Sequence, residues 1–280
     1  MKSSLINING QLLPEEKTGL SIQNRAFKFG DSVFESIRVS KGRALFLEDH
    51  FSRISKGMKE LKFVPSFQWD ISGFRKEILK TIESNSVKNG GRVRYTAFRK
   101  GEGYYTPKSR EMAFTIEAYQ LEQDQYELNS VGQKITIFRD FKLQNNRLSP
   151  YKTNNCLPYI MAGMYAQEEG FDEVLLLNDA GNICEATSSN VFLLINGILY
   201  TPSISEGCTA GVMRKKIIQL ARKMNIAVLE SSLSPSLLED ADEVFFTNAI
   251  VGLKWAAAWE KKRYFHKISA RLTGALNEII

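Results

Sequence analysis

The chain has 280 residues, of which 43% are hydrophobic and 24% are charged, a composition that excludes fibrous and intrinsically disordered proteins. The net charge of +6 comes from basic residues scattered along the chain, which favours a solvated basic surface over a nucleic-acid-binding one. Three cysteines and two histidines, without the spacing of metal ligands, indicate neither a disulfide framework nor a Cys/His metal centre.

The N-terminal segment turns polar too early for a signal peptide, and no apolar run approaches the length that spans a bilayer. We therefore expect a cytoplasmic protein without a membrane partner.

Residues 5–12 alternate apolar and polar side chains around Asn9-Gly10, a pattern that predicts a β-hairpin at the start of the fold.

Strands and helices follow over the next hundred residues. Strand patterns cover residues 33–39, 44–47, 92–99 and 112–119. A helix is predicted to begin at Glu48, and a second helix carries the apolar stripe Phe74, Ile78 and Ile82. Together these elements predict one domain of mixed α and β structure, residues 1–119.

Residues 120–133 lose the apolar periodicity and gain polar side chains, which is typical of a linker between domains. Residues 134–280 again mix helices with strands. Strands are predicted at residues 135–139, 173–177, 190–195, 226–229 and 243–247, and helices at residues 154–169 and after Gly211. The sequence thus predicts two α+β domains, and the cleft between two such domains is where a binding site is expected.

Lys152 precedes an apolar stretch, residues 156–164, that has the pattern of a buried helix. A lysine that is desolvated has a lowered pKa and a nucleophilic neutral amine, the property needed to form a Schiff base with an aldehyde. On this local pattern alone, an exposed lysine in front of a helix is the better interpretation.

Two further positions have a chemical and a structural interpretation. Glu185 precedes four small residues, so a flat ligand could approach its carboxylate, although a surface carboxylate at the end of a hairpin explains the pattern equally well. Gly211 precedes an amphipathic helix whose N-terminus could bind a phosphate, with a simple glycine cap as the alternative. Arg53 could supply a second contact to that phosphate, although an arginine on a helix is usually solvated.

Several motifs follow one another along almost the whole chain. They are Asn24-Arg-Ala-Phe-Lys-Phe-Gly-Asp31, His50-x-x-Arg53, Lys152, Glu185-Ala-Thr-Ser-Ser-Asn190, Gly211-Val-Met-Arg214 and Asp242-Glu-Val-Phe-Phe-Thr-Asn248. In this order they resemble the class IV aminotransferase family, the fold-type IV pyridoxal-phosphate enzymes. That family includes branched-chain aminotransferases, D-amino-acid aminotransferases and aminodeoxychorismate lyases. For Lys152, Glu185, Gly211 and Arg53, the resemblance favours the chemical interpretation over the purely structural one.

The resemblance implies roles for the reactive groups. Lys152 would form the Schiff base with pyridoxal 5′-phosphate and later shuttle protons, and Glu185 would pair with the pyridine nitrogen. A protonated pyridine is a strong electron sink for charge that develops at the α-carbon of the substrate.

The resemblance also implies how the cofactor phosphate is held. Arg53 would act together with the backbone N–H groups of Val212 and Met213. Many aminotransferases of the family add a threonine hydroxyl at the position that appears here as Ala249. We assign Asn248 and the Ala249 backbone in its place.

The fold implied by the resemblance is the two-domain, D-amino-acid aminotransferase-like α+β fold, with the cofactor between the domains. The resemblance further implies a homodimer in which the neighbouring subunit helps to close the site.

The reaction type depends on residues that face the substrate, because aminotransferases and lyases of the family use the same lysine. A glutamate at the position of Glu35 is usual in the aminotransferases of the family, whereas the best-known lyases carry threonine there. Glu35 therefore favours amino transfer. Under the aminotransferase interpretation, Phe34 would line an apolar side-chain pocket, with plain core as the alternative. The resemblance implies that Arg94 lies where the family has a basic or polar residue in contact with the substrate, so we expect Arg94 to anchor the substrate carboxylate. Arg99 has the opposite strand parity to Arg94, so its role is left open.

Two segments have lyase character. The loop of residues 101–107, in which Tyr104 is predicted to contact the substrate, looks more like that of the lyases but lacks their second basic residue. The pair Asn248-Ala249 is also more typical of lyases.

We therefore expect an enzyme that transfers an amino group between an L-amino acid, branched-chain type first, and a 2-oxo acid. The alternative is an aminodeoxychorismate lyase that releases p-aminobenzoate and pyruvate. A third interpretation is a non-enzymatic anion-binding protein, which would be colourless, whereas the enzyme would be yellow.

Overall fold

The computed structural model describes residues 4–280, which divide into two compact units. The first unit contains the chain up to Gln125 together with Tyr151–Asn155, and the second contains Tyr126–Pro150 and Cys156–Ile280. The sequence predicts one domain for all of residues 134–280, whereas the structure assigns the short segment around Lys152 to the first unit.

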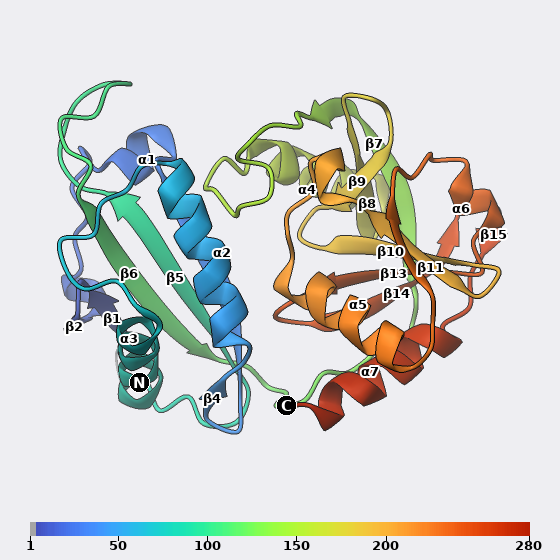
Figure 1. The fold of residues 1–280 in the computed structure, drawn as a ribbon, viewed down its shortest axis with the longest axis horizontal. Helices are drawn as coiled ribbons and strands as arrows, with labels where there is room; N and C mark the ends of the chain where they lie inside the picture. The colour runs from blue at the N-terminus through green and yellow to red at the C-terminus, as the bar shows by residue number, and fades with distance from the viewer. Residues whose placement is uncertain (1–3) are drawn as a thin grey trace. The chain divides into compact units, whose positions relative to one another are not determined.

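An antiparallel sheet of order β2-β1-β6-β5-β3-β4 forms the centre of the first unit (Figure 1). Its strands are β1 (Leu5–Ile8), β2 (Gln11–Pro14), β3 (Ser32–Ser40), β4 (Arg43–Ala44), β5 (Gly91–Arg99) and β6 (Met112–Gln120). β1 and β2 form the predicted hairpin. Its turn residues Asn9 and Gly10 have φ of 51° and 89°, the positive values that an Asn-Gly turn favours.

Two long helices bury their apolar stripes against one face of this sheet. The helices of the unit are the short η1 (Glu15–Lys17), α1 (Arg25–Phe29), α2 (Leu47–Glu60) and α3 (Ile71–Ser84). Ile54 of α2 and Ile78 of α3 share a buried core with Ile37 of β3. The predicted strand over residues 44–47 is wrong beyond Ala44, because Phe46 has a left-handed φ of 54° and α2 begins at the next residue.

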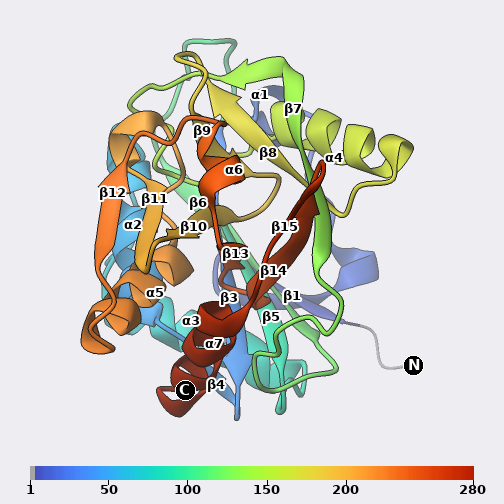
Figure 2. The same ribbon diagram turned by 90° about the vertical axis from the view of Figure 1, so that its right-hand side faces the viewer.

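A second sheet, of order β12-β11-β10-β13-β14-β7-β8-β9, forms the centre of the second unit, and β15 pairs with β14 (Figure 2). Its strands are β7 (Gln133–Leu143), β8 (Glu173–Asn178), β9 (Ile183–Ala186), β10 (Asn190–Ile195), β11 (Ile198–Pro202), β12 (Val228–Ser231), β13 (Glu243–Asn248), β14 (Gly252–Trp259) and β15 (Lys262–Arg263). The pairs β7/β8, β14/β7 and β11/β12 are parallel, and the other pairs are antiparallel.

The helices of the second unit cover this sheet in two places. They are α4 (Leu157–Glu169), η2 (Ile204–Glu206), α5 (Val212–Lys223), α6 (Leu237–Asp240) and α7 (Lys267–Glu278). α4 packs on β7 and β8, whereas α5 and α7 pack on each other and on β13 (Figure 2). Within residues 4–280, the helices are all too short or too polar to cross a bilayer.

Candidate active site

Phe34, Arg94 and Lys152 come together on one face of the first unit's sheet. Val33 and Ile37 of β3 point into the core under α2 and α3, so the alternate residue Phe34 projects from the opposite face. The guanidinium carbon of Arg94 lies 3.7 Å from the centroid of the Phe34 ring, and the Lys152 Nζ lies 4.9 Å from the same centroid. An aromatic ring, a guanidinium and an amine thus form one cluster.

The short segment that carries Lys152 is hydrogen-bonded to β3. The Phe34 N–H donates to the Lys152 carbonyl at 2.8 Å, and the Asn154 N–H donates to the Ser32 carbonyl at 3.2 Å. The Asn154 side-chain oxygen also accepts a hydrogen bond from Arg94 Nη2 at 3.2 Å. The same segment therefore positions both the lysine and the arginine of the cluster.

The face of β3 toward α2 carries a buried ion cluster of Glu35, His50 and Arg53. Arg53 donates from Nε and Nη2 to the two carboxylate oxygens of Glu35 at 2.8 and 2.5 Å, and His50 Nδ1 lies 2.6 Å from Glu35 Oε2. Burial alone would raise the pKa of Glu35, but the charge and hydrogen bonds of Arg53, together with His50, outweigh burial and lower this pKa to about 2. Glu35 is therefore a carboxylate at neutral pH.

This cluster was missed by the sequence analysis, which used Glu35 only to distinguish reaction types and assigned Arg53 to a phosphate. The structure gives Arg53 an intramolecular carboxylate partner on the α2 side of the sheet, opposite to Phe34. A signal was present in the sequence. His50 and Arg53 are three residues apart on one helix, and Glu35 has the strand parity of the core residue Ile37.

Arg99, whose role was left open, forms hydrogen bonds that connect separate segments of the first unit. Its Nε donates to Asp31 Oδ2 at 2.8 Å, and its Nη2 donates to the Leu61 carbonyl at 2.6 Å. Arg25 donates to the same Asp31 oxygen at 2.8 Å. Asp31 therefore bridges two buried arginines, which gives the motif of residues 24–31 a structural purpose.

The side chain of Tyr104 does not join the Phe34 cluster. Its ring is 86% exposed, while its carbonyl accepts a hydrogen bond from Arg25 Nη1 at 2.7 Å. The carbonyl of Gly103 accepts a second hydrogen bond from Arg25 at 2.9 Å. The backbone of the loop is thus anchored, and the substrate contact of the Tyr104 ring stays a prediction.

In the second unit, Glu185 is a buried carboxylate with fixed orientation. The Tyr159 hydroxyl donates to Glu185 Oε1 at 2.6 Å, and the Thr209 N–H donates to Oε2 at 3.0 Å. Burial, followed by the charge of Glu185 and the hydrogen bond to it, raises the pKa of Tyr159 well above its usual value, so this hydroxyl stays a donor. Since Glu185 is only 3% exposed, the interpretation as a surface carboxylate is excluded.

Gly211 is the residue before α5, and its lack of a side chain is required by its surroundings. A Cβ atom at this position would lie 1.9 Å from the side-chain oxygen of Asn190, whose Nδ2 donates to the Thr209 carbonyl at 2.8 Å. Residue 211 gives α5 no side-chain cap, and Val212 and Met213 begin the helix. Their backbone N–H groups belong to the first turn, in which such groups lack intrahelical acceptors.

The side chain of Asn248 stabilises the turn after β13. Its oxygen accepts hydrogen bonds from the N–H groups of Ile250 and Val251 at 3.0 and 2.9 Å, and its Nδ2 donates to Ser189 Oγ at 3.2 Å. The carbonyl of Ala249 accepts a hydrogen bond from the Tyr126 hydroxyl at 2.9 Å. Asn248 thus connects this turn to the loop that follows Glu185.

The two units carry different chemical groups. The first offers an amine and a guanidinium beside an aromatic ring, and the second offers a buried carboxylate and the N-terminus of a long helix. An amine can act as a nucleophile and move protons, whereas a helix N-terminus favours a phosphate. Residues 4–280 contain no cluster of His, Cys, Asp and Glu side chains that could hold a metal ion.

Comparison with known proteins gives a consistent picture. A sequence model of the family described as "Amino-transferase class IV" matches residues 32–257. The D-alanine aminotransferase of Bacillus licheniformis is 28% identical over 247 residues, which cover 86% of this chain and 83% of that protein. The aminodeoxychorismate lyase of Bacillus subtilis is 26% identical over 258 residues, which cover 88% and 84% of the two chains.

The fold has a close counterpart among solved structures. The branched-chain aminotransferase of Thermoproteus uzoniensis, crystallised with norvaline, superposes with a TM-score of 0.91. The match covers 99% of this chain and 94% of that chain at 22% sequence identity, so the likeness concerns the fold.

Proposed function

The chain belongs to the class IV amino-transferase family, and we propose that it is a pyridoxal-phosphate-dependent aminotransferase of L-amino acids. Branched-chain amino acids are the preferred substrates in this proposal. A 2-oxo acid is the proposed amino acceptor. The cluster of Phe34, Arg94 and Lys152 carries the proposal. An amino acid with an apolar side chain offers the matching groups, namely a carboxylate for the guanidinium, an α-carbon proton for the amine and a hydrocarbon for the ring.

The residues of both units fit pyridoxal 5′-phosphate. Lys152 supplies the amine that would hold the aldehyde, and Glu185 supplies a buried carboxylate for the pyridine nitrogen. The small Gly211 and the N–H groups of Val212 and Met213 would hold the phosphate. When bound, the cofactor supplies an electron sink for charge at the α-carbon of the substrate.

Each proposed residue then has a task that follows from its surroundings. Lys152 Nζ moves the proton at the substrate α-carbon. Arg94 holds the substrate carboxylate, since a guanidinium binds a carboxylate through two parallel hydrogen bonds. The contact of Arg53 with the phosphate, which the resemblance implies, stays a prediction, because Nε and Nη2 of Arg53 are held by Glu35. Asn248 shapes the loop after Glu185 through Ser189.

The second candidate is an aminodeoxychorismate lyase. It is favoured by the similarity to the Bacillus subtilis lyase and by the pair Asn248-Ala249. The similarity to a D-alanine aminotransferase makes the stereochemical preference part of the same question.

One panel of reactions separates these candidates. Cofactor-loaded enzyme is supplied with L-leucine and 2-oxoglutarate, with D-alanine and 2-oxoglutarate, and with aminodeoxychorismate. We expect glutamate from the first mixture, and no glutamate in Lys152→Ala. Formation of p-aminobenzoate and pyruvate from the third mixture, without transfer from leucine, would establish the lyase instead.

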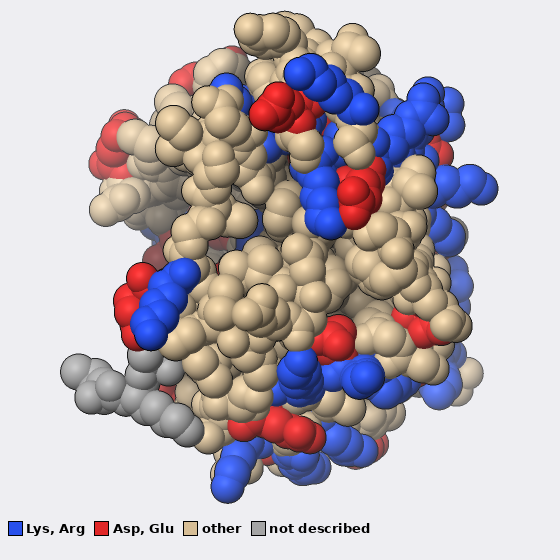
Figure 3. Space-filling view, turned by 90° about the vertical axis from the view of Figure 1, so that its left-hand side faces the viewer, with Lys and Arg blue, Asp and Glu red and all other residues tan. Residues whose placement is uncertain are grey.

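The third interpretation, a non-enzymatic anion-binding protein, is disfavoured because the family is one of enzymes. Figure 3 shows the Lys and Arg side chains of one face in separate groups, with Asp and Glu side chains among them. This distribution does not offer a continuous basic surface to a polyanion on the face drawn.

We further propose that the protein is a homodimer. α4 exposes an apolar stripe at helical spacing, with Leu157 at 72%, Ile160 at 53% and Met164 at 48% exposure. The first unit likewise exposes Phe27 and Tyr104, at 77% and 86%. Such side chains are typical of surfaces that a second copy covers, and a second copy would bring the Tyr104 ring to a site.

Analytical ultracentrifugation tests the dimer. Ile160→Glu is expected to shift the protein toward monomer, because it places a charge in the apolar stripe. Arg271→Glu, at an exposed position of α7, serves as the control and should leave the sedimentation coefficient unchanged. A wild-type chain that sediments as a monomer at all concentrations would contradict the proposal.

A further inference from the structure

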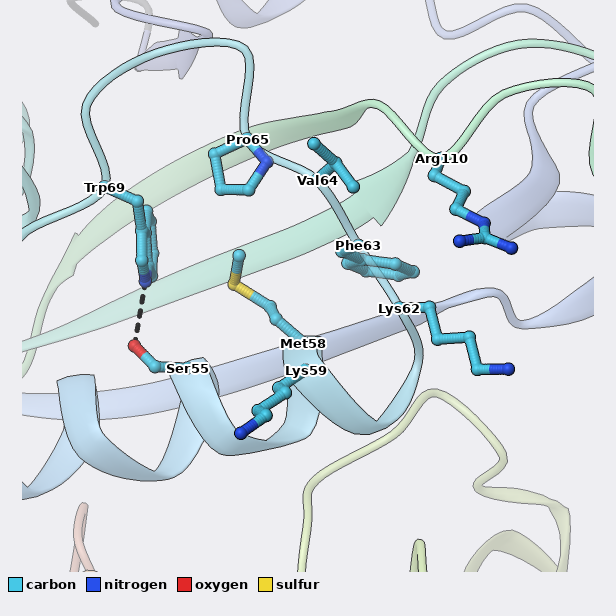
Figure 4. Close-up of a pocket in the computed structure, with 9 residues that line it drawn as sticks. All are labelled: Ser55, Met58, Lys59, Lys62, Phe63, Val64, Pro65, Trp69 and Arg110. Carbon is cyan, nitrogen blue, oxygen red and sulfur yellow. Dashed lines mark hydrogen bonds between the residues drawn. The ribbon is translucent and has the colours of Figure 1, made fainter.

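The first unit contains a pocket of about 320 Å³ that is separate from the proposed active-site residues (Figure 4). It lies between the C-terminal half of α2, the segment that follows α2 and the loop before β6. Phe34, Arg53, Arg94 and Lys152 do not line it. The volume is within the range of pockets that bind small organic molecules.

The interior of this pocket is lined by apolar side chains, and a hydrogen bond fixes the orientation of one of them, Trp69. Met58 lies between Trp69 and Phe63 (Figure 4), and Met58 and Phe63 are only 3% and 7% exposed. The indole N–H of Trp69 donates to Ser55 Oγ at 2.8 Å, which satisfies the polar atom of the ring and fixes its plane. Met58 and Phe63 therefore form the closed floor of the pocket, and the partly exposed Trp69, whose indole donor is satisfied, forms a wall.

Three cations surround this apolar surface. Lys59, Lys62 and Arg110 line the pocket and form no ion pair within residues 4–280, whereas the nearby Lys100 is paired with Glu111 at 2.7 Å. Lys62 and Arg110 lie on the same side of the pocket, away from Trp69 (Figure 4). A pocket with uncompensated positive charge at its rim attracts an anion.

The two segments that carry Lys62 and Arg110 are joined by backbone hydrogen bonds. The Val64 N–H donates to the Arg110 carbonyl at 2.8 Å, and the Met112 N–H donates to the Val64 carbonyl at 2.9 Å. These bonds fix the spacing of the two backbone segments from which the exposed side chains of Lys62 and Arg110 extend.

We propose that this pocket binds a small organic anion with one carboxylate and an aromatic or branched hydrocarbon body. The hydrocarbon would occupy the surface of Met58, Phe63 and Trp69, and the carboxylate would pair with Lys62 and Arg110. An inorganic anion would leave the apolar surface unused, and a neutral aromatic molecule would leave the cations unpaired. The site is independent of the proposed aminotransfer.

Fluorine NMR titration of the cofactor-loaded protein tests this proposal with 4-fluorobenzoate as the probe and 4-fluorobenzamide as its uncharged counterpart. The titrations are made in Arg94→Ala, so that binding of a carboxylate at the proposed substrate anchor does not contribute. In that background, Lys62→Ala/Arg110→Ala removes the proposed cations. Lys261→Ala/Arg271→Ala removes the same charge from exposed positions of the second unit.

We expect saturable binding of the carboxylate, at least about tenfold weaker binding of the amide, and a dissociation constant at least about tenfold higher in Lys62→Ala/Arg110→Ala. The control pair Lys261→Ala/Arg271→Ala should leave the binding of both probes unchanged. A further variant, Trp69→Phe, alters the apolar surface and should weaken the binding of both probes, which separates the effect of packing from the effect of charge. Absence of saturable binding would overturn the proposal. Equal affinity for carboxylate and amide, or equal losses in the two charge variants, would also overturn it.

Discussion

The carboxylate of Glu35 is buried between Arg53 and His50, and each of the three groups depends on the others for its partner. Removing Glu35 leaves a buried guanidinium uncompensated. Glu35→Ala is therefore expected to lower the free energy of unfolding by about 3–5 kcal/mol. Urea denaturation measures this change.

Glu48 provides a matched control on the same helix as His50 and Arg53. Its ion pair with Arg75 at 2.5 Å is formed by exposed side chains, at 71% and 45%. Glu48→Ala should change stability by less than about 1 kcal/mol. If Glu35→Ala and Glu48→Ala lowered the free energy of unfolding equally, the buried cluster would not stabilise the fold more than an exposed ion pair does.

The same cluster predicts a pH dependence. The pKa of Glu35 is lowered from 4.5 to about 2, so between these values the unfolded chain binds a proton that the native protein does not. Its stabilising contribution is thus complete above the unfolded pKa and is lost as pH falls toward the folded pKa. Urea denaturation at decreasing pH should show a steeper loss of stability in the wild type than in Glu35→Gln. Parallel curves would contradict the assignment.

Tyr159 fixes the orientation of Glu185 through its 2.6 Å hydrogen bond. Tyr159→Phe should lower kcat about tenfold and the free energy of unfolding by about 1–3 kcal/mol, since a buried carboxylate loses a donor. Tyr165→Phe, on the same helix, is the control, because its ring packs on Phe138. A kcat in Tyr159→Phe that equals that of Tyr165→Phe would exclude this positioning role.

Single residues differed in how far the sequence could predict them. The resemblance carried by the motif order pointed to Phe34, Arg94 and Lys152, which the structure places together. Tyr159 could not be found in this way, because its importance depends on α4 lying beside Glu185. Arg99 needed the position of Asp31, which is distant in sequence.

At the scale of the element, the N-terminus of α5 depends on the space at Gly211. The φ of this residue is −61°, so a side chain is excluded by the contact with Asn190 and not by backbone strain. Gly211→Ala should therefore displace the turn and weaken cofactor retention about tenfold, measured by equilibrium dialysis.

Gly274→Ala is the control for that substitution. Gly274 lies at an exposed position of α7 with open space around it, so alanine there should stabilise the protein by about 0.5–1 kcal/mol. Unchanged cofactor retention in Gly211→Ala would mean that this helix N-terminus does not hold the phosphate.

Elements with strong periodicity were predicted, and elements without it were not. The strands β3, β5 and β10 were found from alternating or continuous apolar residues. β9 (Ile183–Ala186) is short and wholly buried, and β14 (Gly252–Trp259) is rich in alanine, a residue that is not typical of strands. These strands are formed because their neighbours in the sheet bury them.

At the scale of the whole molecule, the predicted family and fold are confirmed. The order of motifs carried this prediction, since composition and charge fit many globular proteins. The segment Tyr151–Asn155 was not foreseen in the first unit. Its pairing with β3 joins residues far apart in the sequence, and such long-range pairing is not encoded in any local pattern.

The central claim is that Lys152 carries pyridoxal phosphate. Borohydride reduction of the yellow, cofactor-loaded protein, followed by proteolysis and mass spectrometry, tests it most directly. We predict that the reduced cofactor is found on the peptide that contains Lys152 and that Lys152→Ala retains no label. A label on a different lysine, or a protein that remains colourless and unlabelled with excess cofactor, would contradict the account.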